Sequence, residues 1–349
     1  MKHMIFGESH GPAIGVVLED VPPGLTLDLE AVEREMARRA PGKNPLSTSR
    51  KEADLVEILS GLFEGKTCGT PLCAVIRNTD TRSKDYQPDL PRPGHADYAG
   101  YVRYAGCGDY RGGGHFSGRL TAPLVFAGAV AKQLLAERGV FTGAHIRSIF
   151  GIEDQPFDGL HEDRELFEML AAKSFPTISD EAGAKMQEAI QRAREDCDSV
   201  GGSIECCAVG LPAGMGSPDL GENVEGIVSQ HLFAVPAVKA VAFGSGFDFA
   251  SMRGSEANDP IYMENGRVLT RTNHTGGING GITNGMPVWF TAVIRPTPSI
   301  ARPQETITLP GGGSASLTVR GRHDPCIVHR AVPVIEAACA LAMCEILGI

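Results

Sequence analysis

A glycine-rich pattern occurs twice in the 349-residue chain, and this repeat constrains the fold most. Residues 61–72 (GLFEGKTCGTPL) and 277–288 (GINGGITNGMPV) share three glycines, a threonine and a proline at the same spacing. Each copy leads into an apolar run that ends Ala-Val-Ile-Arg, at Arg77 and at Arg295. Glycine-rich turns can also match by chance. If the repeat is genuine, it predicts two related layers about a pseudo-twofold axis, within one domain that spans residues 1–349.

The apolar periodicity predicts a mixed α+β chain. Helices are expected after Asp28, which can cap the first turn, and at residues 122–138, 181–197, 224–232 and 331–349. Strands are expected at residues 14–18, 72–76, 203–209, 239–243 and 287–294, with a hairpin over 305–319. Residues 92–119, 152–180 and 244–285 are expected to form long loops.

Composition excludes several classes of protein. The net charge of −10 argues against general affinity for nucleic acid or an anionic membrane. Nine cysteines without a Cys-x-x-Cys pair indicate free thiols in the cytoplasm rather than a zinc site. The first six residues are too short for the apolar part of a signal peptide. The apolar residues 331–349 are interrupted by Glu336 and Glu345, which favours a buried helix over a membrane span.

Residues 92–119 (RPGHADYAGYVRYAGCGDYRGGGHFSGR) combine arginine, histidine and glycine. Arginine presents a charged donor fork to phosphate or carboxylate, and histidine transfers protons near neutral pH. Glycine lets the backbone approach a ligand closely. We therefore predict a segment that binds an anion and delivers protons to it; the alternative is a surface loop with solvated charges. A second basic cluster, from Arg34 to Lys51, supports a small-anion ligand. Within it, Arg39 is expected in the last turn of the first helix, at the edge of the loop that follows.

Three shorter motifs permit other interpretations. Residues 7–11 (GESHG) fit the nucleophile elbow of serine hydrolases, and a triad of Ser9, His95 and Asp324 can be imagined. An elbow needs a preceding strand and an oxyanion loop, and only six residues precede this one, so an ordinary turn is favoured. Residues 60–67 are one residue short of a P-loop. Residues 322–326 (RHDPC) could be a helix entry with Asp324 as cap.

Taken together, the chain resembles the chorismate synthase family along essentially its whole length. The motifs that carry the resemblance are GESHGPAIGVVLEDVPPG at 7–24, VEILSGLFEGKTCGTPL at 56–72, RPGHADYAGYVRYAG at 92–106, DYRGGGHFSGRLTA at 109–122, DCDSVGGSIE at 196–205, NHTGGINGGITNG at 273–285, RPTPSI at 295–300 and GRHDPC at 321–326. Each motif is moderately specific, whereas all of them in this order are very specific.

The resemblance implies a fold and an activity. The fold is expected to be a β-α-β sandwich with internal duplication, in a homotetramer. The activity is expected to be the anti-1,4 elimination of phosphate from 5-enolpyruvylshikimate-3-phosphate to give chorismate. Reduced FMN is the implied cofactor, with NADPH as a possible reductant, and no metal is expected.

The resemblance also implies residue roles. Catalytic roles fall on Ser9, His10, His95, Ser117 and Asp324. The implied FMN contacts are His115, Phe116, Ser117, Ala237, Gly280, Arg295, Pro296, Thr297, Pro298, Ser299 and Arg322. Substrate anions are assigned to Arg39, Arg50, Arg92 and Arg322. The chain departs from the family pattern at His115, where arginine is usual, and at Arg295, where lysine is usual.

Overall fold

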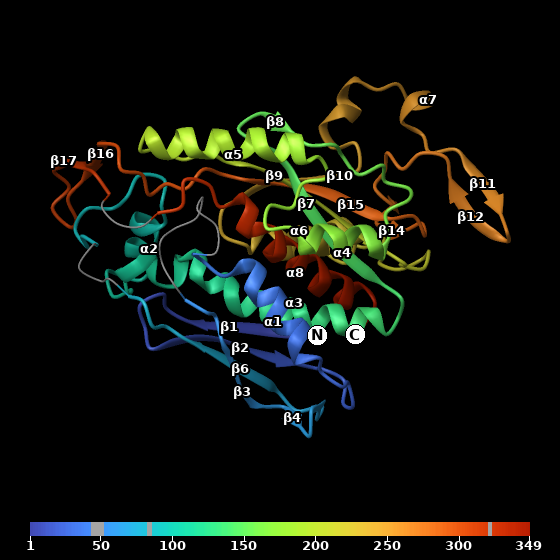
Figure 1. Ribbon diagram of the computed structural model, residues 1–349, viewed down its shortest axis with the longest axis horizontal. Coiled ribbons are helices and arrows are strands. Elements are labelled where there is room, and N and C mark those ends of the chain that lie inside the picture. The colour runs from blue at the N-terminus through green and yellow to red at the C-terminus, as the bar shows by residue number, and fades with distance from the viewer. Residues whose placement is uncertain (43–51, 82–85, 320–322) are drawn as a thin grey trace.

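Two antiparallel sheets enclose a layer of helices in the computed structural model, which describes residues 1–42, 52–81, 86–319 and 323–349 (Figure 1). The first sheet has the order β1 (Lys2–Gly7), β2 (Ala13–Glu19), β6 (Leu72–Arg77), β3 (Val56–Ser60). The second has the order β7 (Phe141–Ile149), β9 (Gly202–Val209), β15 (Val288–Ile294), β10 (Val238–Phe243), with β8 (Ile152–Glu153) beyond β7.

Helices α3 (Thr121–Ala136) and α8 (Val328–Ile346) form the centre of the molecule. Nearly every residue of both is buried, because each contacts the other helix and a sheet. A Cβ atom on Gly128 of α3 would lie 2.2 Å from the Cβ atom of Ala337, so a glycine lets the two helices approach closely. Helices α1 (Leu29–Arg39) and α6 (Val224–Phe233) complete this layer, and the Asp28 side chain caps α1 as expected.

The two halves are built alike. In each, a strand is followed by a turn and a helix, and a glycine-rich hairpin precedes the next strand: β4 (Leu62–Phe63) with β5 (Lys66–Thr67), and β13 (Ile278–Asn279) with β14 (Ile282–Thr283). The Oγ1 atom of Thr67 donates to the Pro22 carbonyl at 2.6 Å and accepts from Leu25 N–H. Thr283 repeats these bonds with Pro212, at 2.7 Å, and Met215. The predicted duplicated β-α-β sandwich is confirmed.

The remaining elements lie around the two sheets and the helix layer. They are α2 (Asp97–Arg103), η2 (Arg111–Phe116), η3 (Gly118–Leu120), α4 (Arg164–Ala172), α5 (Asp180–Glu195), η4 (Gly246–Ser251), α7 (Gly254–Ala257), β11 (Ile261–Glu264), β12 (Arg267–Thr270), β16 (Gln304–Ile307) and β17 (Ser314–Leu317). Helix α4 packs on β7, where a Cβ atom on Gly143 would collide with Phe167. The hairpin β11–β12 projects from the body of the molecule (Figure 1).

Several sequence expectations were wrong. Residues 92–119 contain α2, residues 152–180 contain α4, and the hairpin β11–β12 lies within 244–285. Short helices of this kind have weak periodicity and depend on what they pack against. The strands β1, β3 and β7 were missed. The C-terminal helix is buried as expected, and no helix in the described ranges is long and apolar enough to cross a membrane.

Candidate active site

The GESHG motif forms the turn between β1 and β2. A nucleophile elbow joins a strand to a helix, so the strand–turn–strand geometry contradicts the serine hydrolase alternative. The backbone N–H of Ser9 donates to the Gly114 carbonyl at 3.1 Å. The ring of His115 donates through Nδ1 to the Gly7 carbonyl at 3.0 Å. These two bonds attach the turn to the glycine-rich loop that is 105 residues later in the chain (from 9 to 114).

Three consecutive glycines, 112–114, lie beside the side chains of His10 and His95, the two candidate catalytic histidines. Gly112, Gly113 and Gly114 have φ values of 63°, 84° and 54°, which are left-handed conformations that glycine adopts at low cost. A Cβ atom on Gly112 would lie 2.5 Å from the Nε2 atom of His10. One on Gly113 would lie 3.3 Å from the Nε2 atom of His95. The side chains of His10 and His95 therefore lie against adjacent glycines of one loop, as the hypothesis of a shared site requires.

Arg92, His95 and Asp97 form a hydrogen-bonded group at the start of α2. The Asp97 carboxylate accepts from Arg92 Nε at 2.7 Å and from Arg92 NH2 at 2.9 Å. It also lies 2.6 Å from His95 Nδ1. Burial alone would raise the pKa of Asp97, but the hydrogen bonds from Arg92 and His95 hold it well below its usual range. The ring of Tyr86 lies 5.5 Å from the Arg92 guanidinium and 5.4 Å from the His10 ring.

The segment after β15 contacts the same group. Arg295 donates from NH1 to the Gly94 carbonyl at 2.6 Å, and Arg92 NH1 donates to the Ser299 hydroxyl at 3.1 Å. The backbone N–H of Arg295 donates to the Ala237 carbonyl at 3.0 Å. Ala237 has a φ of 75°, a strained conformation for a residue other than glycine. The Thr297 hydroxyl is buried without a hydrogen-bond partner among the described residues.

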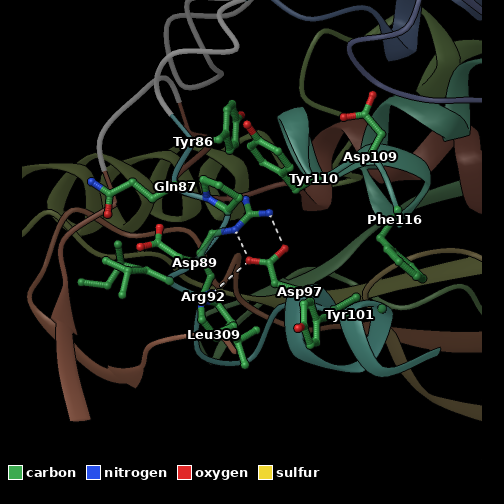
Figure 2. A pocket seen from close by; sticks show the side chains of 18 of the residues that line it. Tyr86, Gln87, Asp89, Arg92, Asp97, Tyr101, Asp109, Tyr110, Phe116 and Leu309 are labelled. Carbon is green, nitrogen blue, oxygen red and sulfur yellow. Dashed lines mark hydrogen bonds and ion pairs between the residues drawn. The ribbon is translucent and has the colours of Figure 1, made fainter. Parts of the chain in front are cut away.

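A cleft of about 540 Å³ opens beside these groups. Figure 2 shows the Arg92–Asp97 ion pair within its lining, with Phe116 from the glycine-rich loop. Aromatic side chains contribute much of the rest: Tyr86, Tyr101, Tyr104 and Tyr110. Phe116 packs over Gly100 of α2, since a Cβ atom there would lie 2.6 Å from its ring. The volume lies in the range typical of small-molecule sites.

Asp324 belongs to a neighbouring network of buried charges. Its carboxylate accepts from Arg330 NH1 at 2.7 Å, and Arg330 Nε donates to the Arg39 carbonyl at 3.2 Å. The expectation that Asp324 caps the last helix was wrong, because α8 begins at Val328. Arg39 in turn donates to Asp54 at 2.7 Å.

The same network reaches the N-terminal turn. Asp54 also pairs with the buried Arg119, and Arg119 Nε donates to Asn78 Oδ1 at 3.0 Å. The Asn78 amide donates to the carbonyls of Glu8 and Gly11, at 3.0 and 2.9 Å. A chain of polar contacts therefore connects the loop of His10 with the segment of Asp324. Of its members, sequence reasoning had proposed a role for Arg39, but none for Asp54, Asn78 or Arg330.

Arg39 ends α1 at the edge of the following loop, as expected, but its side chain is buried. The residue is only 4% exposed, and its guanidinium also bonds Thr121 and the Gly118 carbonyl. Burial lowers the pKa of Arg39 to about 10, although Asp54 opposes this shift. The neighbouring Arg38 pairs with Glu35 and Glu336. These two members of the expected basic cluster are internal ion pairs here, so a substrate contact for Arg39 stays a prediction.

The other predicted residues fall into three groups. Ser117 caps η3, its hydroxyl accepting from Arg119 N–H at 3.3 Å, and Pro296 and Pro298 lie in the segment that contains Thr297. Gly280 lies in the β13–β14 hairpin, at the opposite end of β15 from Arg295, and does not join the cluster within one chain. Arg50 and Arg322 lie outside the described residues.

Sequence reasoning missed several side chains at this site. Asp97 stands two residues after His95 in a motif that was recognised, and this proximity was the available signal. Tyr86 precedes the motif in a segment without a pattern. Asp54, Asn78 and Arg119 are distant in sequence from each other, and no local pattern predicts their pairing.

Comparisons with known proteins show the family of the chain. The sequence profile of the family described as chorismate synthase matches residues 1–347. The chorismate synthase of Aeropyrum pernix is 45% identical over 347 residues, which cover 98% of this chain and 90% of that protein. That of Thermococcus gammatolerans is 46% identical over 348 residues, 99% of this chain and 95% of that protein. A crystal structure of chorismate synthase superposes with a TM-score of 0.78 at 28% identity, covering 99% of this chain and 91% of that one. The protein therefore belongs to the chorismate synthase family.

Proposed function

We propose that this protein eliminates phosphate from 5-enolpyruvylshikimate-3-phosphate to form chorismate, with reduced FMN as cofactor. The observation that supports this most is the position of His10 beside Gly112 and of His95 beside Gly113. The substrate carries a phosphate and two carboxylates. Arg92 and Arg295 provide fixed positive charge beside the two histidines.

We assign the proton for the departing phosphate to His95. Cleavage of the allylic C–O bond places negative charge on the leaving group, and a positioned donor lowers the barrier to that step. The Nε2 atom of His95 is its nitrogen nearest Gly113, so it can meet a ligand held against the glycine backbone. His10, next to Gly112, is assigned to the charge of the flavin.

Membership in the chorismate synthase family implies a reduced flavin cofactor. The residues near the cleft fit FMN. Aromatic rings suit a planar ring system, and polar groups are suited by the Arg295 guanidinium and by the Thr297 hydroxyl, which has no partner in the part of the chain that the structure describes. Further proposed contacts are His115, Phe116, Ser299 and Ala237, whose carbonyl accepts from the backbone N–H of Arg295. Reduced FMN would supply electron density that assists loss of phosphate, and the protein would tune it through nearby charge.

Asp324 and the two serines are assigned to removal of the ring proton. Arg330 holds the Asp324 carboxylate, and the network through Arg39 and Arg119 joins it to the loops of Ser117 and Ser9. This arrangement supports a relay in which Asp324 accepts the proton with Ser9 or Ser117. Arg39, Arg50 and Arg322 remain proposed substrate contacts.

An anaerobic assay tests the activity. We expect the purified protein with chemically reduced FMN to release phosphate and form chorismate from 5-enolpyruvylshikimate-3-phosphate. The His95→Ala variant should lose most of that rate, by about 100-fold or more. A fully active His95→Ala variant would refute the assignment of the proton donor, and the activity itself would stand.

The second candidate is a flavin- or anion-binding protein without turnover. His115 and Phe116 favour it, because they replace residues usual in the family at the flavin side of the loop. Tight FMN binding without phosphate release, under the same anaerobic conditions, would select this alternative. Replacing reduced FMN with FMN plus NADPH in the assay tells whether the protein reduces its own flavin.

We further propose a cytoplasmic homotetramer in which residues 1–349 form one domain. Nine free cysteines suit a reducing compartment, and one buried apolar cluster is shared by both halves. The separation of Gly280 from the other proposed flavin contacts supports an assembly in which a second copy completes the site. Light scattering after size-exclusion chromatography measures the oligomer; a monomer that retains full activity would contradict it.

A further inference from the structure

We propose that Asp97 is a positioning residue that fixes the tautomer and orientation of the His95 ring. This inference rests on the proposed role of His95 as proton donor. Asp97 is absent from the residues that the family resemblance assigned. Its carboxylate is four-fifths buried and lies 2.6 Å from His95 Nδ1.

The hydrogen bonds around Asp97 decide which atom of His95 carries the proton. His95 Nδ1 lies 3.1 Å from Arg92 NH2 and 2.6 Å from Asp97 Oδ1. Arginine can only donate and a carboxylate can only accept, so Nδ1 cannot bond with both. The shorter distance and the negative charge of Asp97 favour Nδ1–H as the donor to Asp97. Arg92 NH2 then donates to Asp97 Oδ1, at 2.9 Å.

Asp97 itself is held in place from four directions. Its Oδ2 atom accepts from the backbone N–H and the Nε atom of Arg92, at 3.0 and 2.7 Å. Its Oδ1 atom accepts from Arg92 NH2 and His95 Nδ1. Because Arg92 also reaches Ser299 at 3.1 Å, the carboxylate connects α2 with the segment after β15. A rotation of the His95 ring would therefore break bonds in a group fixed on several sides.

The consequence for His95 is a defined direction for Nε2. With Nδ1 occupied by Asp97, Nε2 is the nitrogen left to exchange a proton with a ligand, and it is the nitrogen near Gly113. The ring donates from Nε2 when both nitrogens carry hydrogen, and in that state Nδ1–H still faces the Asp97 carboxylate. A carboxylate behind a catalytic histidine acts in this way in serine proteases without accepting the proton itself.

The first test needs no variant. In ¹⁵N NMR spectra of the wild-type protein near pH 8, with resonances assigned by loss of the signal in His95→Gln, neutral His95 should carry its hydrogen on Nδ1. Hydrogen on Nε2 would overturn the inference, whatever the enzyme's activity. The tautomer is independent of turnover, so this readout separates failure of the inference from failure of the proposed function.

The second test compares kinetics. Asp97→Asn keeps the size of the side chain and should lower kcat by about 100-fold with KM changed less than about threefold. Asp97→Glu should recover part of the loss. The matched control is Asp158→Asn, because Asp158 makes the same kind of contact with His161 Nδ1, at 2.8 Å, on the surface.

The variants give clear outcomes. The control should keep the wild-type kcat, and Asp97→Asn should show a mixture of His95 tautomers while its melting temperature stays near that of the control. A wild-type kcat in Asp97→Asn, in an enzyme that His95→Ala inactivates, would overturn the positioning role. If Asp97→Asn does not fold, the wild-type tautomer and the Asp97→Glu rate still decide the matter.

Discussion

Gly112 leaves no room for a side chain beside His10: a Cβ atom at position 112 would lie 2.5 Å from both Cδ2 and Nε2 of the His10 ring and 2.9 Å from the Ser9 hydroxyl. The glycine also has a φ of 63°. We therefore expect Gly112→Ala to push the His10 ring out of place. Its kcat should fall by at least about 10-fold, since small displacements of positioned groups cost large factors in rate.

The control for this prediction is Gly139→Ala. Gly139 has a similar φ of 72°, but a Cβ atom there meets nothing within 4 Å. In both variants an alanine in the left-handed conformation costs about 1 kcal/mol. Only Gly112→Ala also displaces His10. Steady-state kinetics and thermal melting of the two variants separate strain from displacement. Equal kcat in both would show that the contact with His10 does not matter.

The contact between Arg330 and Asp324 gives a second prediction. Removing one charged partner from a largely buried pair costs on the order of 1–3 kcal/mol. We expect Arg330→Met to lower both the melting temperature and kcat, because Asp324 loses a charged partner at 2.7 Å. Arg302→Met is the control, since Arg302 pairs with Asp198 at the surface at the same 2.7 Å. An active, stable Arg330→Met variant would contradict the prediction.

Local patterns predicted the framework well. The repeated glycines and threonine predicted two related layers, and in these layers Thr67 and Thr283 make the same pair of bonds to a preceding turn. Apolar periodicity predicted α3 and the strands β2, β6, β9, β10 and β15, because a buried face repeats apolar residues at a regular spacing. The family resemblance brought His10, His95 and Arg92 into one hypothesis, and the structure places them beside the same loop.

What the sequence could not predict depends on contacts between distant segments. Arg39 ends a helix beside a loop, as expected, but its burial against the counter-charge of Asp54 was not predicted. No local pattern near either residue predicts that pairing. The family resemblance grouped Gly280 with the other proposed flavin contacts, yet a motif carries no information about which end of a strand it occupies. Asp97 was overlooked because its role appears only when hydrogen-bond directions are known.

The contact between α3 and α8 gives a third prediction, on stability. Gly128→Ala would place a Cβ atom 2.2 Å from that of Ala337 and 2.4 Å from its Cα atom. Two buried helices would have to move apart, which typically costs about 1–3 kcal/mol. Gly254→Ala is the control, because its Cβ atom would point into open space from the short helix α7. Denaturant unfolding should show a lower midpoint for Gly128→Ala alone; equal midpoints would mean that the helices separate without cost.

The buried His145 gives the last prediction, on pH dependence. Its Nδ1 atom lies 3.1 Å from Asp154 and its Nε2 atom 2.9 Å from Glu205, so both ring nitrogens face acceptors. Burial alone would lower the pKa of His145, but the hydrogen bonds and charges of the two carboxylates outweigh it and raise the pKa. The charged ring is therefore favoured in the folded protein.

The sign of the effect follows from linkage. A raised folded pKa gives stability that is fully present below the unfolded value of about 6.5 and is lost as the pH rises through the folded pKa. We expect the free energy of unfolding to fall above about pH 6.5, with a slope of at most about 1.4 kcal/mol per pH unit from this group. His145→Gln should flatten that slope, whereas His161→Gln, at an exposed histidine paired with Asp158, should leave it nearly unchanged. Denaturant titrations of the three proteins between pH 6 and 9 measure the slopes, and parallel curves for wild type and His145→Gln would rule out a charged His145.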